Sequence, residues 1–103
     1  MTQPMTVLVV ARGERIIDRM ISLMDADGIA AEGTLNDDDA VSKIEGGEIS
    51  TLVIGGGVEP PSRDRLKAFA NRSGVRVIEG ELGGEEPETY FYEELLPALS
   101  DYR

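Results

Sequence analysis

The stretch STLVIGGGVEPPS, residues 50–62, indicates how this chain folds. Its first part contains consecutive apolar residues, so both faces of an extended strand would be apolar. This is typical of a strand buried on both faces of a parallel sheet. Three glycines end the apolar run, and Pro60, Pro61 and Ser62 are typical of the first turn of a helix. The stretch therefore predicts a strand that leads into a helix through the loop Gly55–Gly57.

Strand-like and helix-like segments alternate along the rest of the chain. The segment TVLVVA, residues 6–11, is another apolar run with no polar face. Apolar residues then recur at helical spacing over residues 16–24, and Gly28 provides a stop. Asn36 is typical of a helix N-cap, and Asp37–Asp39 would lie in a first turn that favours negative charge. We interpret these aspartates as helix-start chemistry and not as a site.

Four strands and four helices are expected in all. The strands fall at residues 6–11, 29–35, 50–55 and 75–80, and the last helix carries Phe91, Leu95, Leu99 and Tyr102 along one stripe. Short connections between alternating strands and helices require right-handed crossovers, which produce a parallel sheet. The sequence predicts one α/β domain over residues 1–103 with three α/β/α layers. Its four-stranded parallel sheet has the order 2-1-3-4, a truncated flavodoxin-like arrangement.

The composition excludes several classes of chemistry. The chain has no cysteine and no histidine, which removes disulfides, Cys–His zinc sites and histidine general bases. No apolar run approaches the roughly 20 residues of a membrane-spanning helix, and the N-terminal MTQPMT lacks the basic region of a signal peptide. We therefore expect a soluble, cytoplasmic protein.

The chain is strongly acidic. Acidic residues outnumber basic ones by 20 to 10, so the formal net charge is −10. Such a chain repels phosphate backbones and anionic lipids, and we expect no nucleic-acid and no membrane partner. Lys43 and Lys67 are the only lysines beside eight arginines. This composition fits either a protein adapted to high salt or an ordinary acidic domain.

The pattern over residues 6–80 resembles the receiver domain of bacterial response regulators. VLVVARGERIIDRMISLMDADGIAAEGTLNDDDAVSKI is similar in length and phasing to a receiver's first strand, first helix, second strand and second helix. TLVIGGGVEP lies where receivers carry their third strand, their phospho-accepting aspartate and, four residues later, a proline. In this correspondence Pro60 matches the proline and Gly56 takes the place of the aspartate.

The other positions that the resemblance marks as functional also differ. Receivers hold Mg²⁺ with an acidic pair after the first strand, where this chain has Ala11 and Arg12. Their Ser or Thr falls in IEGE, residues 78–81, and their lysine before the fifth strand has no counterpart. The fifth strand is either lost or represented by a remnant, TYFY, residues 89–92. The segment YEELLPAL that follows is similar to the start of a receiver's last helix. Phosphoryl transfer needs a carboxylate nucleophile, a metal and a cation. The comparison therefore implies no phosphorylation site, no cofactor and no enzyme activity.

Three explanations of the loop Gly55–Gly57 stay open. A sharp turn can require positive φ or close backbone approach, which glycine allows. Alternatively, backbone N–H groups form an anion-binding nest at the carboxyl edge of the sheet beside a helix N-terminus, with Arg12 and Gly13 nearby. In the third explanation a partner protein packs on the flat glycine surface. Neither a P-loop lysine nor a dinucleotide fingerprint accompanies the loop, so the nucleotide signal is weak.

Four glutamates lie at or just beyond expected strand ends: Glu14, Glu59, Glu79 and Glu81. Carboxylates that converge there could hold a divalent cation with oxygen ligands. In an acid-rich chain, however, loop glutamates are more often solvated. No metal site is expected.

The best interface candidates lie near the C-terminus. Tyr90, Phe91 and Tyr92 hold three of the five aromatic side chains in adjacent positions, so at least one must face outward or into a neighbour. Leu95 and Leu99 continue that surface along the last helix. The fourth expected strand leaves an unpaired edge, and a homodimer through this strand or the last helix would cover it.

Together these observations favour a non-catalytic, receiver-like module that binds an unknown protein partner without phosphorylation. The alternative is a small-molecule or anion-binding domain that uses Gly55–Gly57 and Arg12.

Overall fold

The computed structural model describes residues 6–55, 57–79 and Pro97. The strands are β1 (Thr6–Val10), β2 (Ala30–Thr34), β3 (Ile49–Ile54) and β4 (Arg76–Glu79), and the helices are α1 (Glu14–Ala26), α2 (Asp37–Glu45) and α3 (Pro60–Arg72). No helix within these ranges is long and apolar enough to cross a membrane. The expected last helix, the strand remnant and their residues Tyr90, Phe91, Tyr92, Leu95 and Leu99 lie outside the described part of the chain, as do Gly56 and Glu81.

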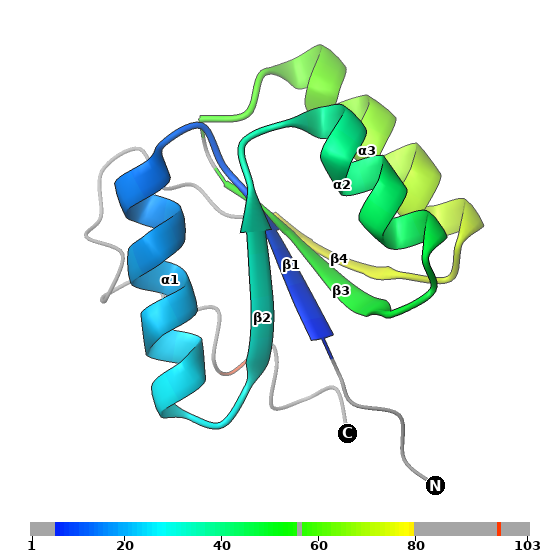
Figure 1. Ribbon diagram of the computed structural model, residues 1–103. Helices are drawn as coiled ribbons and strands as arrows, with labels where there is room; N and C mark the ends of the chain where they lie inside the picture. The colour runs from blue at the N-terminus through cyan, green and yellow to red at the C-terminus, as the bar shows by residue number, and fades with distance from the viewer. Residues whose placement is uncertain (1–5, 56, 80–96, 98–103) are drawn as a thin grey trace, which may run out of the picture.

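The four strands pair in parallel in the order β2-β1-β3-β4, as the sequence predicts. Helix α1 lies on one face of the sheet, and α2 and α3 lie together on the other (Figure 1). The predicted three-layer α/β/α architecture is therefore confirmed. Each strand ends within a residue of its predicted end, and β2 occupies an edge.

Strand β3 begins one residue earlier than expected. The register between β1 and β3 shifts after Thr6, which pairs with Ile49, whereas Val7 pairs with Thr51. Ser50 is the extra residue, and its hydroxyl donates a hydrogen bond to the carbonyl of Thr6 at 3.2 Å. This irregularity adds Ile49 to the strand and to the core.

Strands β1 and β3 contribute side chains to both faces, so the domain has two cores. The core under α1 contains Val7, Val9, Ala11, Ile17, Met20, Met24 and Val53. The core under α2 and α3 contains Leu8, Val10, Ala40, Ile44, Ile49, Leu52, Ile54, Val58, Leu66, Ala70 and Val75. Full burial of each large apolar side chain contributes roughly 1.5–3 kcal/mol before entropy costs. The uninterrupted apolar runs in the sequence are the direct cause of this double burial.

Helix ends follow the residues that the sequence singles out. The side chain of Asn36 accepts hydrogen bonds from the amides of Asp38 and Asp39 at 2.8 and 3.1 Å, which confirms it as the N-cap of α2. Gly28 and Gly74, which follow α1 and α3, have φ values of 76° and 75°. Glycine reaches this left-handed region without the clash that a Cβ causes.

Helix α1 packs unusually close to β2 at Gly33. A Cβ built on Gly33 would lie 2.2 Å from Cγ2 of Ile17 and 2.9 Å from Cδ1 of Ile21. The absence of a side chain therefore sets the distance between helix and strand.

Candidate functional site

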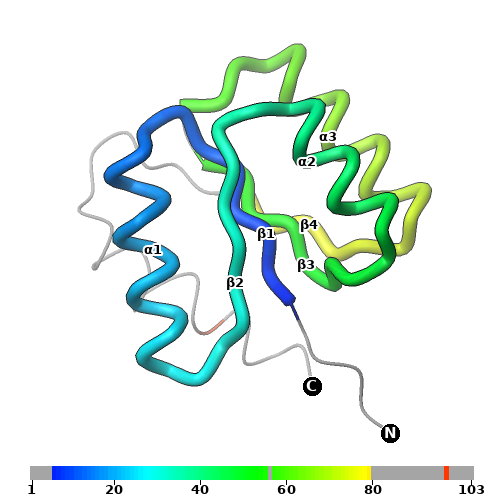
Figure 2. The backbone as a smooth tube through the Cα atoms, viewed as in Figure 1, coloured from blue at the N-terminus to red at the C-terminus, as the bar shows by residue number. Residues whose placement is uncertain are grey.

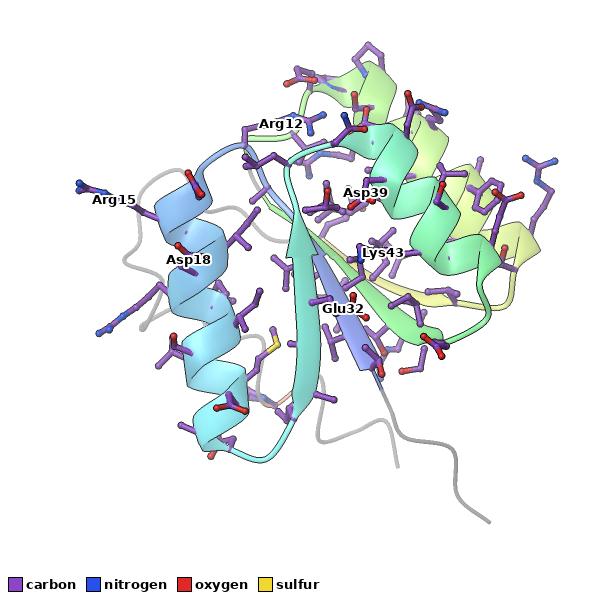
Figure 3. All side chains as sticks on the ribbon, viewed as in Figure 1. Arg12, Arg15, Asp18, Glu32, Asp39 and Lys43 are labelled. Carbon is purple, nitrogen blue, oxygen red and sulfur yellow. The ribbon has the colours of Figure 1, made fainter. Side chains whose placement is uncertain are left out.

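The loops after β1, β2 and β3 meet at the carboxyl edge of the sheet. Figure 2 shows these three turns gathered at the upper end of the domain, beside the N-termini of α2 and α3. They meet because β1 lies between β2 and β3 in a parallel sheet, so that all three strands end at the same edge. Arg12, in the loop after β1, reaches across this edge (Figure 3).

The guanidinium of Arg12 contacts both other loops. Its Nη1 donates to the carbonyl oxygen of Leu35 at 2.7 Å, and its Nη2 donates to Oδ1 of Asp37 at 2.8 Å. Its Nε and Nη2 donate to the two carboxylate oxygens of Glu59 at 3.1 and 3.2 Å, a bidentate pair. All three guanidinium nitrogens are therefore engaged, and Arg12 links the three loops.

The two carboxylates differ in exposure. The side chain of Asp37 is 17% exposed and that of Glu59 is 59% exposed, while Arg12 is 26% exposed. Asp37 is thus held inside the loop cluster, whereas Glu59 covers Arg12 from the solvent side.

Ionisation in this cluster follows from the contacts. Hydrogen bonds with Glu59 and then Asp37 raise the pKa of Arg12 above its ordinary value. The hydrogen bond from Arg12 lowers the pKa of Glu59. Burial disfavours the charged form of Asp37, but hydrogen bonds with Ser62 and Arg12 outweigh it and leave the pKa of Asp37 below its ordinary value. The cluster is therefore a charged ion-pair network at neutral pH.

A second pair extends the network along the helices. Ser62, in the first turn of α3, has its hydroxyl oxygen 3.3 Å from Oε2 of Glu59, and it also hydrogen-bonds with Asp37. Arg65 of α3 donates to Asp38 of α2 at 2.9 Å, an exposed pair. These residues line an open cavity of about 400 Å³ together with Arg12 and Leu35. Leu35 is 45% exposed and is the one large apolar side chain in the described residues that is exposed.

The structure brings only some of the predicted ligand residues together. Arg12 and Gly57 are neighbours: a Cβ on Gly57 would meet Cβ of Arg12 at 3.7 Å, an ordinary contact. Gly13 instead acts as the N-cap residue of α1, and its carbonyl accepts the amide of Ile17. Gly13 is therefore part of a helix start.

The glycine loop is a poor anion nest in its described part. The N–H of Gly55 donates to Val10 at 2.8 Å, and its carbonyl accepts from the Val58 amide and from Arg63. The positive φ values recorded in the described residues belong to Gly28, Gly47 and Gly74, at helix ends. Moreover, the first two residues of α3 are prolines, which lack the N–H groups that a helix N-terminus offers to an anion.

Within the described ranges, Glu14, Glu59 and Glu79, which were considered as metal ligands, do not gather. Glu59 pairs with Arg12, and Glu79 pairs with Arg63 and Lys67 of α3 at 3.2 Å each, while Glu14 begins α1. Among the described residues no group of three or more acidic side chains is arranged to hold a metal ion. An Mg²⁺ site like that of receivers does not fit, because Arg12 already places a positive charge between Asp37 and Glu59.

The sequence missed Asp37 and Ser62 as members of the cluster. The sequence predicts both as helix-start residues, which they also are. The signal that could have found them is positional: each lies in the first turn of a helix that follows a strand predicted to lie beside β1, on the edge where Arg12 lies.

Comparisons with known proteins give matches in structure alone. No family model matches the chain, and no curated protein matches its sequence. The N-terminal domain of a response regulator receiver protein from Methanoculleus marisnigri superposes with a TM-score of 0.61 at 16% identity, over 93% of this chain and 94% of that one. The chemotaxis protein CheY4 of Vibrio cholerae gives 0.59 at 14% identity, over 94% and 97%.

A pilus assembly-related protein from Burkholderia pseudomallei is also similar. It superposes with a TM-score of 0.56 at 19% identity, over 98% of this chain and 91% of that one. At such low identities the likeness concerns the fold. This chain has the receiver-like, flavodoxin-like fold that its sequence predicts.

Proposed function

We propose that this chain is a receiver-like module that binds a protein partner through a fixed surface, without phosphorylation and without catalysis. The observation that carries the proposal is the contact set of Arg12. At the edge where receivers bind Mg²⁺ and accept a phosphoryl group, this chain has an arginine that is paired with Asp37 and Glu59. A cation that is part of the chain stays at this edge without a bound metal ion and without a phosphoryl group.

The residues at this edge lack the groups that phosphoryl transfer requires. Gly56 takes the acceptor's place in the sequence and carries no carboxylate. Asp37, the most enclosed carboxylate of the cluster, is held by Arg12, and its lowered pKa makes it a weak nucleophile and a weak base. An ion-pair network of this kind stabilises the edge without a phosphoryl group.

Treatment with acetyl phosphate and Mg²⁺ tests this proposal. Intact mass spectrometry should give an unchanged mass. A conventional receiver domain treated in parallel serves as the positive control. A phosphoryl adduct on any aspartate of this chain would overturn the proposal.

The partner that the proposal allows most simply is a second copy of the chain. Among the described residues β4 is the last strand of the order β2-β1-β3-β4, and a strand in this position is where a second copy could extend the sheet. We expect a C2 dimer through this edge or the last helix. Light scattering at tens of micromolar protein should give twice the monomer mass, and a strictly monomeric protein would limit the proposal to a different partner.

The proposal places the protein in the cytoplasm and assigns it no cofactor. Replacement of Arg12 by Ala separates it from the ligand-binding alternative. The change should leave a partner complex largely intact if the surface is elsewhere, whereas it should abolish the binding of a small anion.

A further inference from the structure

The donor groups around Glu59 converge on a single carboxylate. Nε and Nη2 of Arg12 present a planar fork, which matches the two oxygens of a carboxylate or phosphate. The hydroxyl of Ser62 lies 3.3 Å from the same carboxylate. Two nitrogens of Arg12, in the loop after β1, and the hydroxyl of Ser62, in the first turn of α3, therefore converge on one oxyanion, and this oxyanion belongs to the chain itself.

Arg12 is positioned without Glu59. The Leu35 carbonyl and the enclosed carboxylate of Asp37 hold the guanidinium at 2.7 and 2.8 Å, which are the shorter contacts of the set. The contacts to Glu59 are 3.1 and 3.2 Å, and its side chain is the most exposed of the three. Glu59 can thus leave while the donor fork stays in place.

The space next to Glu59 can receive a ligand. The cavity of about 400 Å³ is lined by Arg12, Glu59, Ser62 and Arg65. With Glu59 turned away, two arginines and two aspartates remain among its charged lining residues, so the formal charge of the lining changes from −1 to zero. Arg65 donates to Asp38 through one nitrogen and has further N–H groups for an incoming oxygen.

We propose that the Arg12–Ser62 pocket is an oxyanion-binding site that Glu59 occupies as an internal ligand. A carboxylate or phosphate group supplied in trans displaces Glu59 and takes its contacts with Nε and Nη2 of Arg12. Since the site lies between the N-termini of α2 and α3, this exchange frees the loop before α3 from the loop after β1. The inference goes beyond the proposed partner role and does not depend on it.

The test compares two variants of equal charge. Glu59→Gln removes the internal ligand, and Glu32→Gln removes a carboxylate that pairs with Lys43 outside the cavity (Figure 3). Both variants and the wild-type chain are titrated with inorganic phosphate and, separately, with sodium acetate at constant ionic strength. The Nε–Hε resonance of Arg12 and the amide of Ser62 report binding by NMR.

We expect Glu59→Gln to bind at least one of the two anions more tightly than Glu32→Gln, by about threefold, which is the scale of an exposed ion pair. Shifts should centre on Arg12, Ser62 and Arg65, and a further Ser62→Ala change should weaken them. Tighter binding of phosphate identifies a phosphate ligand, and tighter binding of acetate identifies a carboxylate ligand.

Two results would overturn the inference. One is equal affinity of Glu59→Gln and Glu32→Gln for both anions, which would attribute any gain to net charge. The other is a titration in which the anions shift the resonances of distant arginines but not the Nε–Hε resonance of Arg12. The side-chain amide of Gln could replace the Glu59 carboxylate as a partner of Arg12. Glu59→Ala removes that group as well, and its anion affinity must also exceed that of Glu32→Gln. Neither result would bear on the acetyl phosphate experiment, so the two proposals fail separately.

Discussion

Arg12 connects residues that are far apart in the sequence. Leu35, Asp37 and Glu59 follow it by 23, 25 and 47 positions, yet all three accept hydrogen bonds from its guanidinium. A lysine could not replace it, because a single ammonium cannot span a bidentate carboxylate, a second carboxylate and a carbonyl in one plane. The chemistry of this one side chain decides the state of the whole edge.

Arg12 should make stability depend on pH in acid. The folded protein holds the pKa values of Asp37 and Glu59 below their ordinary values, so the unfolded chain binds more protons as pH falls. The two carboxylates therefore make their full contribution to the free energy of unfolding above roughly pH 5, where they are ionised in the unfolded chain. This contribution is lost as pH falls through their lower pKa values in the folded protein. In Arg12→Met the free energy of unfolding should be lower at neutral pH, and the difference from wild type should shrink in acid.

The matched control for that change is Arg15→Met. Arg15 lies on the outer side of α1 and points away from the sheet (Figure 3). Urea unfolding measures the free energy of unfolding of both variants between about pH 2 and pH 7. This range brackets the ordinary carboxyl pKa values of about 4. Identical pH profiles for Arg12→Met and Arg15→Met would contradict the role given to the ion pairs.

Thr51 is a second residue with a testable energetic role. It is fully buried in β3, and its hydroxyl oxygen has no hydrogen-bond partner within the described structure. An unpaired buried hydroxyl costs about 1–3 kcal/mol, so Thr51→Val should raise the free energy of unfolding by about 1 kcal/mol. Thr34→Val is the control, since its hydroxyl accepts the Asn36 amide at 3.1 Å and its loss should destabilise. Destabilisation by Thr51→Val would show that the hydroxyl has a partner in solution.

At the scale of elements, the spacing of α1 from β2 depends on a glycine. Helix α1 packs directly on the strand through Ile17 and Ile21, and the edge strand has only small residues beneath them. The strand has weak intrinsic propensity, since it contains two alanines and a glycine. Its position thus comes from packing with α1 and pairing with β1.

Gly33→Ala should therefore destabilise the domain although alanine is the smallest addition. The new Cβ would meet Cγ2 of Ile17 at 2.2 Å, so the helix or the side chain must move, at a cost of about 1–3 kcal/mol. Chemical denaturation measures the loss. Ile17→Ala provides the room that is missing, so the same Gly33→Ala change should cost less in that background. Additive losses in the double variant would rule out the contact as the cause.

At the scale of the whole molecule, charge opposes compactness. We expect the self-repulsion from a net charge of −10 on 103 residues to exceed the gain from surface ion pairs such as Lys43–Glu32 and Arg65–Asp38. Screening by salt should relieve the repulsion more than it weakens these pairs.

The free energy of unfolding should accordingly rise when KCl is added to a low-salt buffer. An ordinary acidic domain should reach a plateau by a few tenths molar, where the Debye length is shorter than about 8 Å. A protein adapted to high salt should continue to gain stability towards molar concentrations. Thermal unfolding over a KCl series distinguishes the two, and a flat or falling profile would contradict the dominance of repulsion.

The sequence alone determined the elements and their order. Apolar runs, helical spacing, an Asn N-cap and glycine stops are local features, and each acts on its own segment whatever the rest of the chain does. The alternation of strands and helices with short connections restricts the sheet to a few topologies. The predicted parallel order is the one that the structure has, β2-β1-β3-β4. Arg12 was found as a lone cation near a glycine loop, without its partners.

Only the tertiary structure decided what Arg12 does. Asp37 carried a local explanation as a helix-start residue, and nothing local to it indicates a partner 25 positions earlier. The close approach at Gly33 was equally hidden, because it depends on where Ile17 lies across the layer. Both contacts arise when parallel pairing places β1 between β2 and β3 and packs α1 on the sheet, and such distances between segments are properties of the packed chain that no single segment contains.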